Sequence, residues 1–247
     1  MKAMVLAAGL GTRLRPLTDN KPKALVEVAG RTLLEITLTR LKSFGVGEAI
    51  VNVHHFADQV VDYLEFHNNF AMRIEVSRED VLLDTGGGLK KAAWFFLENG
   101  TDQPFLLHNV DVLSSIDLAQ MVKAHQESQS LATVAVQKRE SSRQLLFDER
   151  GQLCGRRAGR DEKPEMVRPT PISEPLAFNG IHVISPHLLK LITEDGFFSI
   201  VNTYLRLAGQ HEKISAFRAD AFYWRDLGKP EGIREASLDL AQRAFLS

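Results

Sequence analysis

Short apolar runs alternate with stretches of helical periodicity over the first half of the chain. The apolar runs have the length of buried strands and lie at residues 2–7, 49–53, 72–76, 104–107 and 131–136. Between them, apolar residues at helical spacing predict helices from Leu33 to about Gly45, over 58–66, after Gly88 through Leu97, and over 117–128. Thr32 and Glu35 have the spacing of a capping box at the start of the first helix. Strands and helices that alternate in this way are typical of a doubly wound, mostly parallel sheet.

The pattern changes after residue 136. Residues 144–159 predict a hairpin with its turn at 148–151, and residues 160–175, with four prolines and many charges, predict an irregular excursion. Further strands are expected at 177–184, 214–217 and 221–224, and helices at 186–192, 199–208 and 230–245. We therefore predict an α/β fold, a Rossmann-like doubly wound sheet sandwiched by helices, with a smaller mixed β subregion. All of it is expected to form a single domain over residues 1–247.

Composition limits the classes of partner. The 247 residues hold 30 Lys and Arg against 31 Asp and Glu, which gives a net charge of −1 and argues against nucleic acid or an anionic membrane as a partner. No apolar run approaches the roughly 20 residues that a membrane-spanning helix needs. The N-terminal apolar run leads into Gly-Thr-Arg instead of a signal-cleavage pattern, and Cys154 is the single cysteine. These features predict a cytoplasmic protein without an internal disulfide.

The first predicted strand runs into a basic loop that contains glycine, AAGLGTRLRPLTDNKPKAL. Residues 11–24 hold four basic side chains and one acidic side chain. The loop is not a dinucleotide fingerprint, because Leu14 stands where the third glycine is required. It is not a P-loop either, because Thr12 and Arg13 follow Gly11 where that motif needs Lys and then Ser or Thr.

The residues of this loop still suit phosphate. Gly9 and Gly11 allow the backbone to turn sharply and bring N–H groups against an anion. Arg13 can place two parallel donors on a phosphate, and Lys23 adds a compact positive charge. The sequence therefore predicts a phosphate-binding loop directly after the first strand.

Together with three later motifs, this loop resembles the signature of the sugar-1-phosphate nucleotidyltransferases. The later motifs are the Gly-rich turn LDTGGG after the third strand, an Asp that closes the fourth strand, and WRDLGKP near the end, in the family's order over residues 1 to about 235. The resemblance implies transfer of a nucleoside monophosphate from an NTP to a sugar 1-phosphate, with release of pyrophosphate. The TGGG form is most similar to the compact N-acetylmuramate-1-phosphate uridylyltransferase-like branch, which favours UTP.

The resemblance also implies which residues bind the nucleotide and act on it. Contacts to the triphosphate are expected from Ala8, Gly9, Gly11, Thr12, Arg13 and Lys23. Contacts to the base and ribose are expected from Asp84, Thr85, Gly86 and Gly87. The catalytic residues implied are Arg13, Lys23 and Asp111, because the reaction must align two polyanions and stabilise the departing charge.

Two aspartates match the family's metal ligands, and the implied cofactor is Mg²⁺. Asp111 ends the fourth predicted strand, where ligands bind in open α/β sheets, and Asp226 precedes a Gly and a helix-starting Pro. An aspartate at the end of a strand can also be a simple helix cap or turn residue. The family commonly has Gly before the first Asp, whereas this chain has Val110, which narrows the approach to the sugar side.

Contacts to the sugar phosphate are implied for Asn109, Asn179 and Gly180. Glu162-Lys163-Pro164 spells a tripeptide that relatives use beside the sugar phosphate, although it also fits a solvated turn. The resemblance divides the domain into a nucleotide-binding half, residues 1–136, and a sugar-phosphate and metal half, residues 137–247.

Other functions stay open at this stage. The same chemistry could serve guanylyl transfer to mannose or heptose 1-phosphate, or cytidylyl transfer to phosphocholine. A nucleotide-binding regulatory protein without activity is a third alternative. The expected partners are an NTP and a sugar 1-phosphate, with no nucleic acid and no membrane, and the oligomeric state is open.

Overall fold

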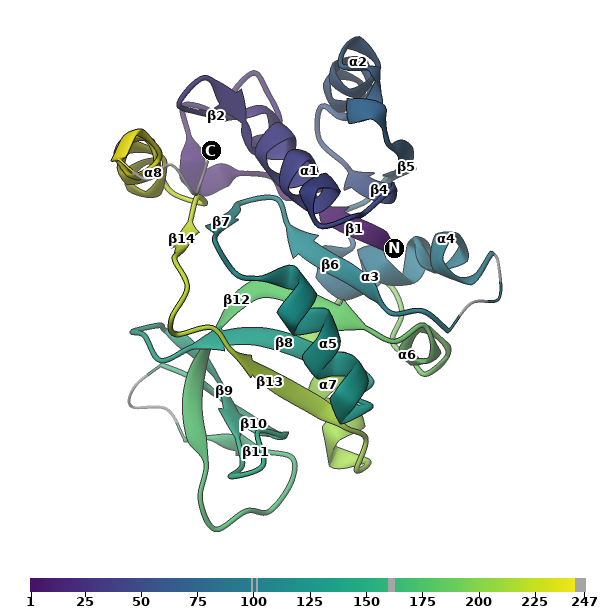
Figure 1. Ribbon diagram of the computed structural model, residues 1–247, viewed down its shortest axis with the longest axis vertical. Helices are drawn as coiled ribbons and strands as arrows, with labels where there is room; N and C mark the ends of the chain where they lie inside the picture. The colour runs from purple at the N-terminus through teal and green to yellow at the C-terminus, as the bar shows by residue number, and fades with distance from the viewer. Residues whose placement is uncertain (99, 101, 160–162, 243–247) are drawn as a thin grey trace. The chain divides into compact units, whose positions relative to one another are not determined.

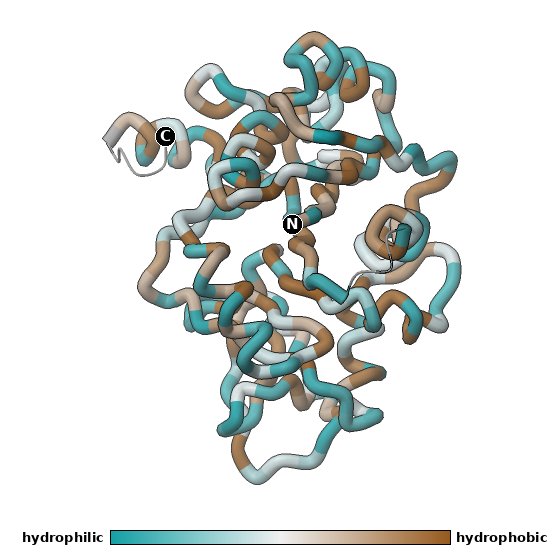
Figure 2. Tube along the Cα trace, turned by 45° about the vertical axis from the view of Figure 1, so that its right-hand side comes forward, coloured by the Kyte–Doolittle hydropathy of each residue, from teal (hydrophilic) through white to brown (hydrophobic). Residues whose placement is uncertain are grey.

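The computed structural model describes residues 1–98, 100, 102–159 and 163–242, and the chain divides into two compact units. Unit 1 comprises Met1–Asp84, Leu107–Ile116 and Phe222–Ser247, and unit 2 comprises Thr85–Leu106 and Asp117–Ala221. Each unit is therefore assembled from segments that are far apart in the sequence. Figure 2 shows hydrophobic and hydrophilic stretches alternating along the chain, as expected where short buried strands are joined by polar loops.

Unit 1 is built on parallel strands. Strand β1 (Lys2–Leu6) pairs in parallel with β4 (Glu48–Val53), which pairs in parallel with β5 (Arg73–Arg78), and β6 (Phe105–Asn109) lies on the other side of β1. Helices α1 (Leu33–Ser43) and α2 (Ala57–Phe66) lie beside these strands in Figure 1. The prediction of parallel strands alternating with helices is confirmed in this unit.

Helix α1 begins where its sequence predicts. The Thr32 Oγ1 accepts a hydrogen bond from the Glu35 N–H at 3.0 Å, which satisfies one of the free donors of the first turn. The Glu35 carboxylate accepts from Arg31 Nε at 2.9 Å and from the Tyr63 hydroxyl at 3.2 Å. The Thr32 half of the predicted capping box is thus formed, while Glu35 binds side chains instead.

Short elements complete unit 1. They are the 3₁₀ turns η1 (Thr12–Leu14), η2 (Lys23–Leu25) and η3 (Asn68–Ala71), the antiparallel pair β2 (Glu27–Val28) and β3 (Arg31–Thr32), and the antiparallel pair β7 (Val112–Ser114) and β14 (Trp224–Asp226). Helix α8 (Pro230–Gln242) follows. Strand β14 had been expected at 221–224 from its apolar residues, but its pairing with β7 moves it to the polar Trp-Arg-Asp segment.

Unit 2 contains a mixed sheet. Strand β12 (Glu174–Ile184) pairs antiparallel with β8 (Ala132–Gln137), and β13 (Ile214–Arg218) pairs with β8 in parallel. Helix α5 (Leu118–Ser128) packs on β8, β12 and β13, and α7 (Ile200–Gly209) packs on β10 and β13. Figure 1 shows α5 in front of these strands. The shorter helices of this unit are α4 (Ala93–Leu97) and α6 (His187–Lys190).

The predicted hairpin is present in unit 2. Strands β9 (Arg143–Phe147) and β10 (Leu153–Ala158) pair antiparallel, and the turn is closed by a hydrogen bond from Gly151 N–H to Asp148 O at 2.9 Å. In the described part of the following excursion, β11 (Glu165–Met166) pairs with β10. The Cys154 side chain is buried in β10, where its thiol donates to Leu146 O at 3.2 Å.

The glycine triplet had been expected to form a turn, and this expectation is wrong. Gly86, Gly87 and Gly88 lie inside helix α3 (Asp84–Lys91) and are buried. Glycine disfavours a helix, so packing must favour it here. A Cβ on Gly86 would lie 2.3 Å from the Phe198 ring and 2.9 Å from Ile200 N, which shows that the ring and the loop pack directly on the helix backbone. Within the described ranges, no helix has the length and apolar character needed to cross a membrane.

Candidate active site

The loop after β1 adopts the sharp turn that its glycines predict. Gly11 has a φ of +65°, and its carbonyl accepts hydrogen bonds from Leu14 N–H at 2.8 Å and from Thr18 Oγ1 at 2.9 Å. A Cβ at Gly11 would lie 2.8 Å from the Thr18 methyl group. Thr18 is buried and was not singled out from the sequence, although it holds the loop in this shape. The sequence gives no sign of it because a threonine in a basic loop is common.

Lys23 and Asp111, two of the charged residues predicted for catalysis, contact each other in unit 1. Lys23 begins η2 directly after Pro22, and its Nζ forms an ion pair with a carboxylate oxygen of Asp111. Asp111 lies in the turn between β6 and β7. The two side chains are only 13% and 14% exposed, so solvent screens the pair less than it would at the surface.

Asp226 reaches the same place through the pairing of β14 with β7. The register sets Asp226 opposite Val112, the residue after Asp111. The Leu227 N–H donates to the Asp111 carbonyl at 2.8 Å, which fixes the two backbone segments against each other. The two aspartates, which are 115 positions apart along the printed sequence, therefore lie side by side in unit 1.

Gly228 marks the point where the charged groups converge. A Cβ built on Gly228 would lie 2.7 Å from Arg13 Nη2, 2.9 Å from Asp226 Oδ1 and 3.0 Å from Asp111 Oδ2. The Gly228 N–H donates to Asp226 Oδ1 at 2.8 Å. Since Lys23 pairs with Asp111, two cationic and two anionic side chains surround this position. The structure thus brings together Arg13, Lys23, Asp111 and Asp226.

The same geometry tests whether a divalent cation fits. Carboxylate oxygens of Asp111 and Asp226 lie within 3.0 Å of one point, and hard oxygen donors are the ligands that Mg²⁺ prefers. The described residues contain no group of three or more His, Cys, Asp or Glu side chains that could hold a metal. A cation at these two aspartates would therefore take its remaining ligands from phosphates and water, as Mg²⁺ commonly does. Asp111 and Asp226 are therefore compatible with a bound Mg²⁺ ion.

The residues predicted to meet the base and ribose lie at the start of α3. Asp84 has a φ of +59°, and Thr85 Oγ1 accepts from Ile200 N–H at 3.0 Å. The N–H groups of Gly86 and Gly87 donate to Phe198 O at 2.9 and 3.3 Å. These two amides already have partners inside unit 2, so they shape the segment and are not open donors.

The residues predicted to meet the sugar phosphate lie in different elements. Asn109 is the last residue of β6, and its Oδ1 is buried with no hydrogen-bond partner among the described residues. In unit 2, Asn179 and Gly180 lie at an irregularity of the pairing of β12 with β8, where Gly180 has a φ of +74°. The Asn179 Oδ1 accepts from Arg139 Nη2 at 3.3 Å.

Two further sequence features have simple locations. Val110 is buried, and its N–H donates to Leu6 O at 3.2 Å, so its side chain belongs to the core of unit 1. In the tripeptide Glu162-Lys163-Pro164, Glu162 lies outside the described residues, and Lys163 and Pro164 are exposed.

His108 is a buried group on β6, three residues before Asp111. Its Nδ1 lies 2.7 Å from Asn109 O, and burial lowers the pKa of His108 to about 4. The ring is therefore neutral at pH 7 and adds no charge beside Asp111.

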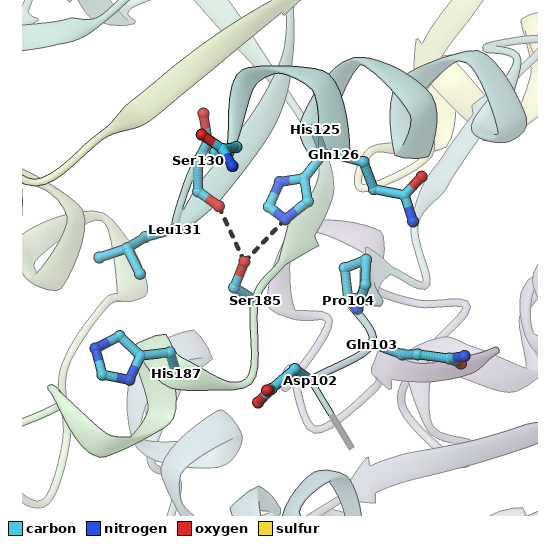
Figure 3. A pocket seen from close by; sticks show the side chains of 10 residues that line it. Asp102, Gln103, Pro104, His125, Gln126, Ser130, Leu131, Ser185 and His187 are labelled. Atoms are coloured by element: carbon cyan, nitrogen blue, oxygen red, sulfur yellow. Dashed lines mark hydrogen bonds between the residues drawn. The ribbon is translucent and has the colours of Figure 1, made fainter.

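A separate pocket of about 530 Å³ lies in unit 2. Figure 3 shows His125, Ser130 and Ser185 joined by hydrogen bonds in its wall, with Asp102 and His187 across from them. Its lining includes none of the residues predicted for nucleotide, sugar or metal binding.

These features describe an α/β protein with a charged site at the carboxyl ends of parallel strands. The chain matches the family model described as Nucleotidyl transferase over residues 2–243. It is 34% identical to N-acetylmuramate alpha-1-phosphate uridylyltransferase of Caulobacter vibrioides, in an alignment that covers 97% of each chain. The chain therefore belongs to the nucleotidyl transferase family, which confirms the resemblance drawn from its motifs.

Other relatives extend this result. The chain is 30% identical to probable mannose-1-phosphate guanylyltransferase 2 of Arabidopsis thaliana, over 93% of this chain but only 62% of that relative's length. Among solved structures, HddC from Yersinia pseudotuberculosis complexed with GMP-PN has a TM-score of 0.74 at 22% identity and covers 97% of this chain and 99% of that one. A UDP-glucose pyrophosphorylase complexed with UDP-glucose has a TM-score of 0.76 at 19% identity and covers 98% of both chains. These structures confirm the predicted fold, an α/β arrangement with a large, mostly parallel sheet flanked by helices.

Proposed function

We propose that this nucleotidyltransferase transfers a nucleoside monophosphate, UMP in the first place, from an NTP to a sugar 1-phosphate. The observation that carries the proposal is the convergence of Arg13, Lys23, Asp111 and Asp226 beside Gly228 in unit 1. The relative of 34% identity, which matches 97% of this chain, is named as a uridylyltransferase, and this supports UTP as the donor.

The chemistry suits this set of residues. A phosphate oxygen of the sugar phosphate attacks the α-phosphorus, the bond from that phosphorus to the β-phosphate oxygen breaks, and its electron pair leaves with pyrophosphate. The attacking oxygen is already anionic, so the step needs alignment and charge stabilisation more than a base. Arg13 and Lys23 would supply positive charge to the phosphates, and the loop residues Ala8, Gly9, Gly11 and Thr12 would hold the triphosphate through their backbone.

Asp111 and Asp226 would hold a Mg²⁺ ion. When bound, the ion would reduce the negative charge that develops on the phosphates. Lys23 would keep the Asp111 carboxylate turned toward the site through their ion pair. We therefore propose Mg²⁺ as the cofactor, held by Asp111 and Asp226.

The remaining contacts are assigned by position along the chain. Asp84 and Thr85 would meet the base and ribose, with Gly86 and Gly87 shaping that segment. Asn109, Asn179 and Gly180 would meet the sugar phosphate. The buried Oδ1 of Asn109, which has no hydrogen-bond partner in the part of the chain that the structure describes, supports a polar partner for it. A cytoplasmic location stays part of the proposal.

Guanylyl transfer is the second candidate. The relative of 30% identity is named as a probable mannose-1-phosphate guanylyltransferase, which supports GTP as an alternative donor. The two candidates share the site and differ only in the base and the sugar.

Pyrophosphate release tests both candidates. Purified protein with Mg²⁺ is incubated with UTP, GTP, CTP or dTTP against a panel of sugar 1-phosphates and phosphocholine. We expect turnover with UTP and N-acetylmuramate 1-phosphate or a related sugar, and at least roughly 100-fold slower turnover in Asp111→Asn. Turnover with GTP alone would replace the first candidate by the second, and no release with any pair would overturn both.

A further inference from the structure

Two buried polar side chains lie near the ends of the paired strands β4 and β5 in unit 1. Asn52, on β4, is 2% exposed, and Glu79, directly after β5, is 4% exposed. A buried carboxylate is costly unless hydrogen bonds compensate it, so the partners of Glu79 show what it is there to hold.

The partners form one continuous chain of hydrogen bonds. The Ala7 N–H donates to Asn52 Oδ1 at 2.7 Å, and Asn52 Nδ2 donates to Glu79 Oε1 at 2.7 Å. The other carboxylate oxygen, Glu79 Oε2, accepts from the Leu83 N–H at 3.0 Å. Both ends of the Asn52 amide and both oxygens of Glu79 form hydrogen bonds, so the series of hydrogen bonds is continuous from Ala7 to Leu83.

The backbone of Glu79 is itself fixed. Its N–H donates to Val53 O at 2.8 Å, and its carbonyl lies 2.8 Å from His54 Nδ1. The carboxylate therefore cannot follow a shift of either end without breaking contacts to β4.

The two ends of this chain are the starts of two predicted nucleotide-binding segments. Ala7 is the residue before Ala8, where the phosphate loop begins, and Leu83 is the residue before Asp84. Asp84 has a φ of +59°, a left-handed conformation that a non-glycine residue keeps only when its surroundings hold it. A device that fixes Leu83 also fixes how Asp84 enters α3.

We propose that Asn52 and Glu79 are positioning residues that set the spacing, within unit 1, between the start of the triphosphate loop at Ala8 and Asp84, the first residue of the predicted base and ribose segment. This inference rests on the proposed function, because it takes both segments to bind one nucleotide. The buried bridge would let the phosphates and the base be bound at the same time without a cost for moving either segment. Its loss weakens the binding of the NTP and leaves the binding of the sugar phosphate nearly unchanged.

The bridge can be broken and rebuilt by exchanging its donor and acceptor chemistry. In Glu79→Gln, the new amide presents N–H donors to either Asn52 Nδ2 or the Leu83 N–H, so one contact is lost. In Asn52→Asp, a second carboxylate faces Glu79. In the double variant, the aspartate accepts from the Ala7 N–H and from the glutamine amide, whose oxygen accepts from the Leu83 N–H. Every donor then has an acceptor again, at the same net charge as the wild type.

The measurement is the Kd for UTP by calorimetry in Mg²⁺ buffer, together with KM for each substrate and kcat. We expect each single variant to raise the Kd for UTP by roughly 10-fold or more, because a buried group loses its partner. The double variant is expected to return the Kd to within about 3-fold of the wild type, since its contacts are complementary again. KM for the sugar phosphate should stay nearly constant throughout. Ser130→Ala, which removes a buried hydrogen bond of 2.7 Å to Ser215 in unit 2, is the control that should lower the melting temperature without changing the Kd for UTP.

Several outcomes contradict the bridge. Folded single variants that bind UTP as the wild type does would overturn it, and so would a folded double variant that fails to recover. If a single variant does not fold, the double variant is compared directly with the wild type, and a weaker Kd for UTP in the folded double variant overturns the proposal. A wild type that binds UTP without turnover contradicts the proposed function, and the Kd values still decide the bridge. A wild type that binds no nucleotide contradicts both.

Discussion

Because Gly228 has no side chain, it leaves space among the charged side chains of the candidate site. The backbone of this residue lies among Arg13, Asp111 and Asp226, and a methyl group there would come within 3.0 Å of all three side chains. The neighbours are ends of polar side chains, which can move aside at modest cost to the fold. The space at Gly228 therefore matters more for the alignment of charges than for stability.

We expect Gly228→Ala to lower kcat/KM by roughly 10²-fold, because displacement of reacting groups by about 1 Å has effects of that size. The free energy of unfolding should change by less than about 1 kcal/mol, since flexible side chains absorb the clash. Steady-state pyrophosphate release and urea unfolding measure the two effects. Gly47→Ala is the matched control, because no atom of a described residue beyond its chain neighbours lies within 4 Å of its added Cβ, and its φ is not in the left-handed region. Wild-type kcat/KM in Gly228→Ala would show that the charged groups do not need this space.

At the scale of elements, α3 shows why one motif has two explanations. The Gly-rich turn at residues 86–88 was expected to contact a nucleotide. In the structure, Gly86 packs so closely on Phe198 that an added Cβ would lie 2.3 Å from the ring. The close packing within unit 2 is a sufficient reason for glycine at this position, whatever the ligand does.

Gly86→Ala should therefore lower the free energy of unfolding by about 1–3 kcal/mol, the usual effect of overpacking. A second substitution, Phe198→Leu, removes the ring atoms that clash and should recover part of this loss in Gly86→Ala. Urea unfolding of the two single variants and the double variant gives the coupling between the sites. Equal stability of Gly86→Ala and the wild type would mean that the ring moves freely, and the packing explanation would fail.

The elements that the sequence predicts well are those that local physics decides. Strand β1 and helix α1 follow from an apolar run and from a capped periodic stretch, and both form as expected. Strand β14 was placed too early because its pairing with β7, and not its hydropathy, sets its limits. The α3 glycines were misjudged because helix propensity is overridden by packing against a loop more than 100 residues away.

The charged residues of the candidate site could be predicted from the sequence, but the residues that shape and hold the surrounding backbone could not. Asp111 and Asp226 could be named because their motifs resemble those of a family. Gly228, Thr18 and the bridge of Asn52 to Glu79 could not, because their contacts depend on strand register and on turns of the backbone. A pair such as Asn52 and Glu79 has no periodic signature, and only the folded chain brings its members together.

For the whole molecule, charge is arranged locally. The net charge is −1, yet Arg13 and Lys23 are gathered with Asp111 and Asp226 within unit 1. A nearly neutral protein attracts polyanions little at long range, so binding of the phosphates must depend on this close cluster. This agrees with a small anionic substrate.

Stability of the whole molecule should depend on pH through His125. This side chain is buried on α5 between two hydroxyl groups, with Nδ1 at 3.0 Å from Thr133 Oγ1 and Nε2 at 3.0 Å from Ser185 Oγ (Figure 3). Burial lowers the pKa of His125 to about 4 from the ordinary value of 6.5. The folded protein therefore keeps this ring neutral over a pH range in which the unfolded chain binds a proton.

The sign of the effect follows from this difference in proton binding. Between pH 6.5 and 4 the unfolded state binds more protons at this site, so the free energy of unfolding falls as the pH is lowered and levels off below about 4. The shift corresponds to a loss of up to about 3 kcal/mol across that window. In His125→Asn, whose amide can still meet Thr133, this contribution is absent, and its curve of unfolding free energy against pH should be flatter than that of the wild type. Urea unfolding at half-unit steps from pH 7 to 4 measures both curves, and the difference between them removes the contributions of His108 and of the carboxylates, which are common to both proteins. Parallel curves would mean that His125 accepts a proton in the folded state as readily as in the unfolded chain.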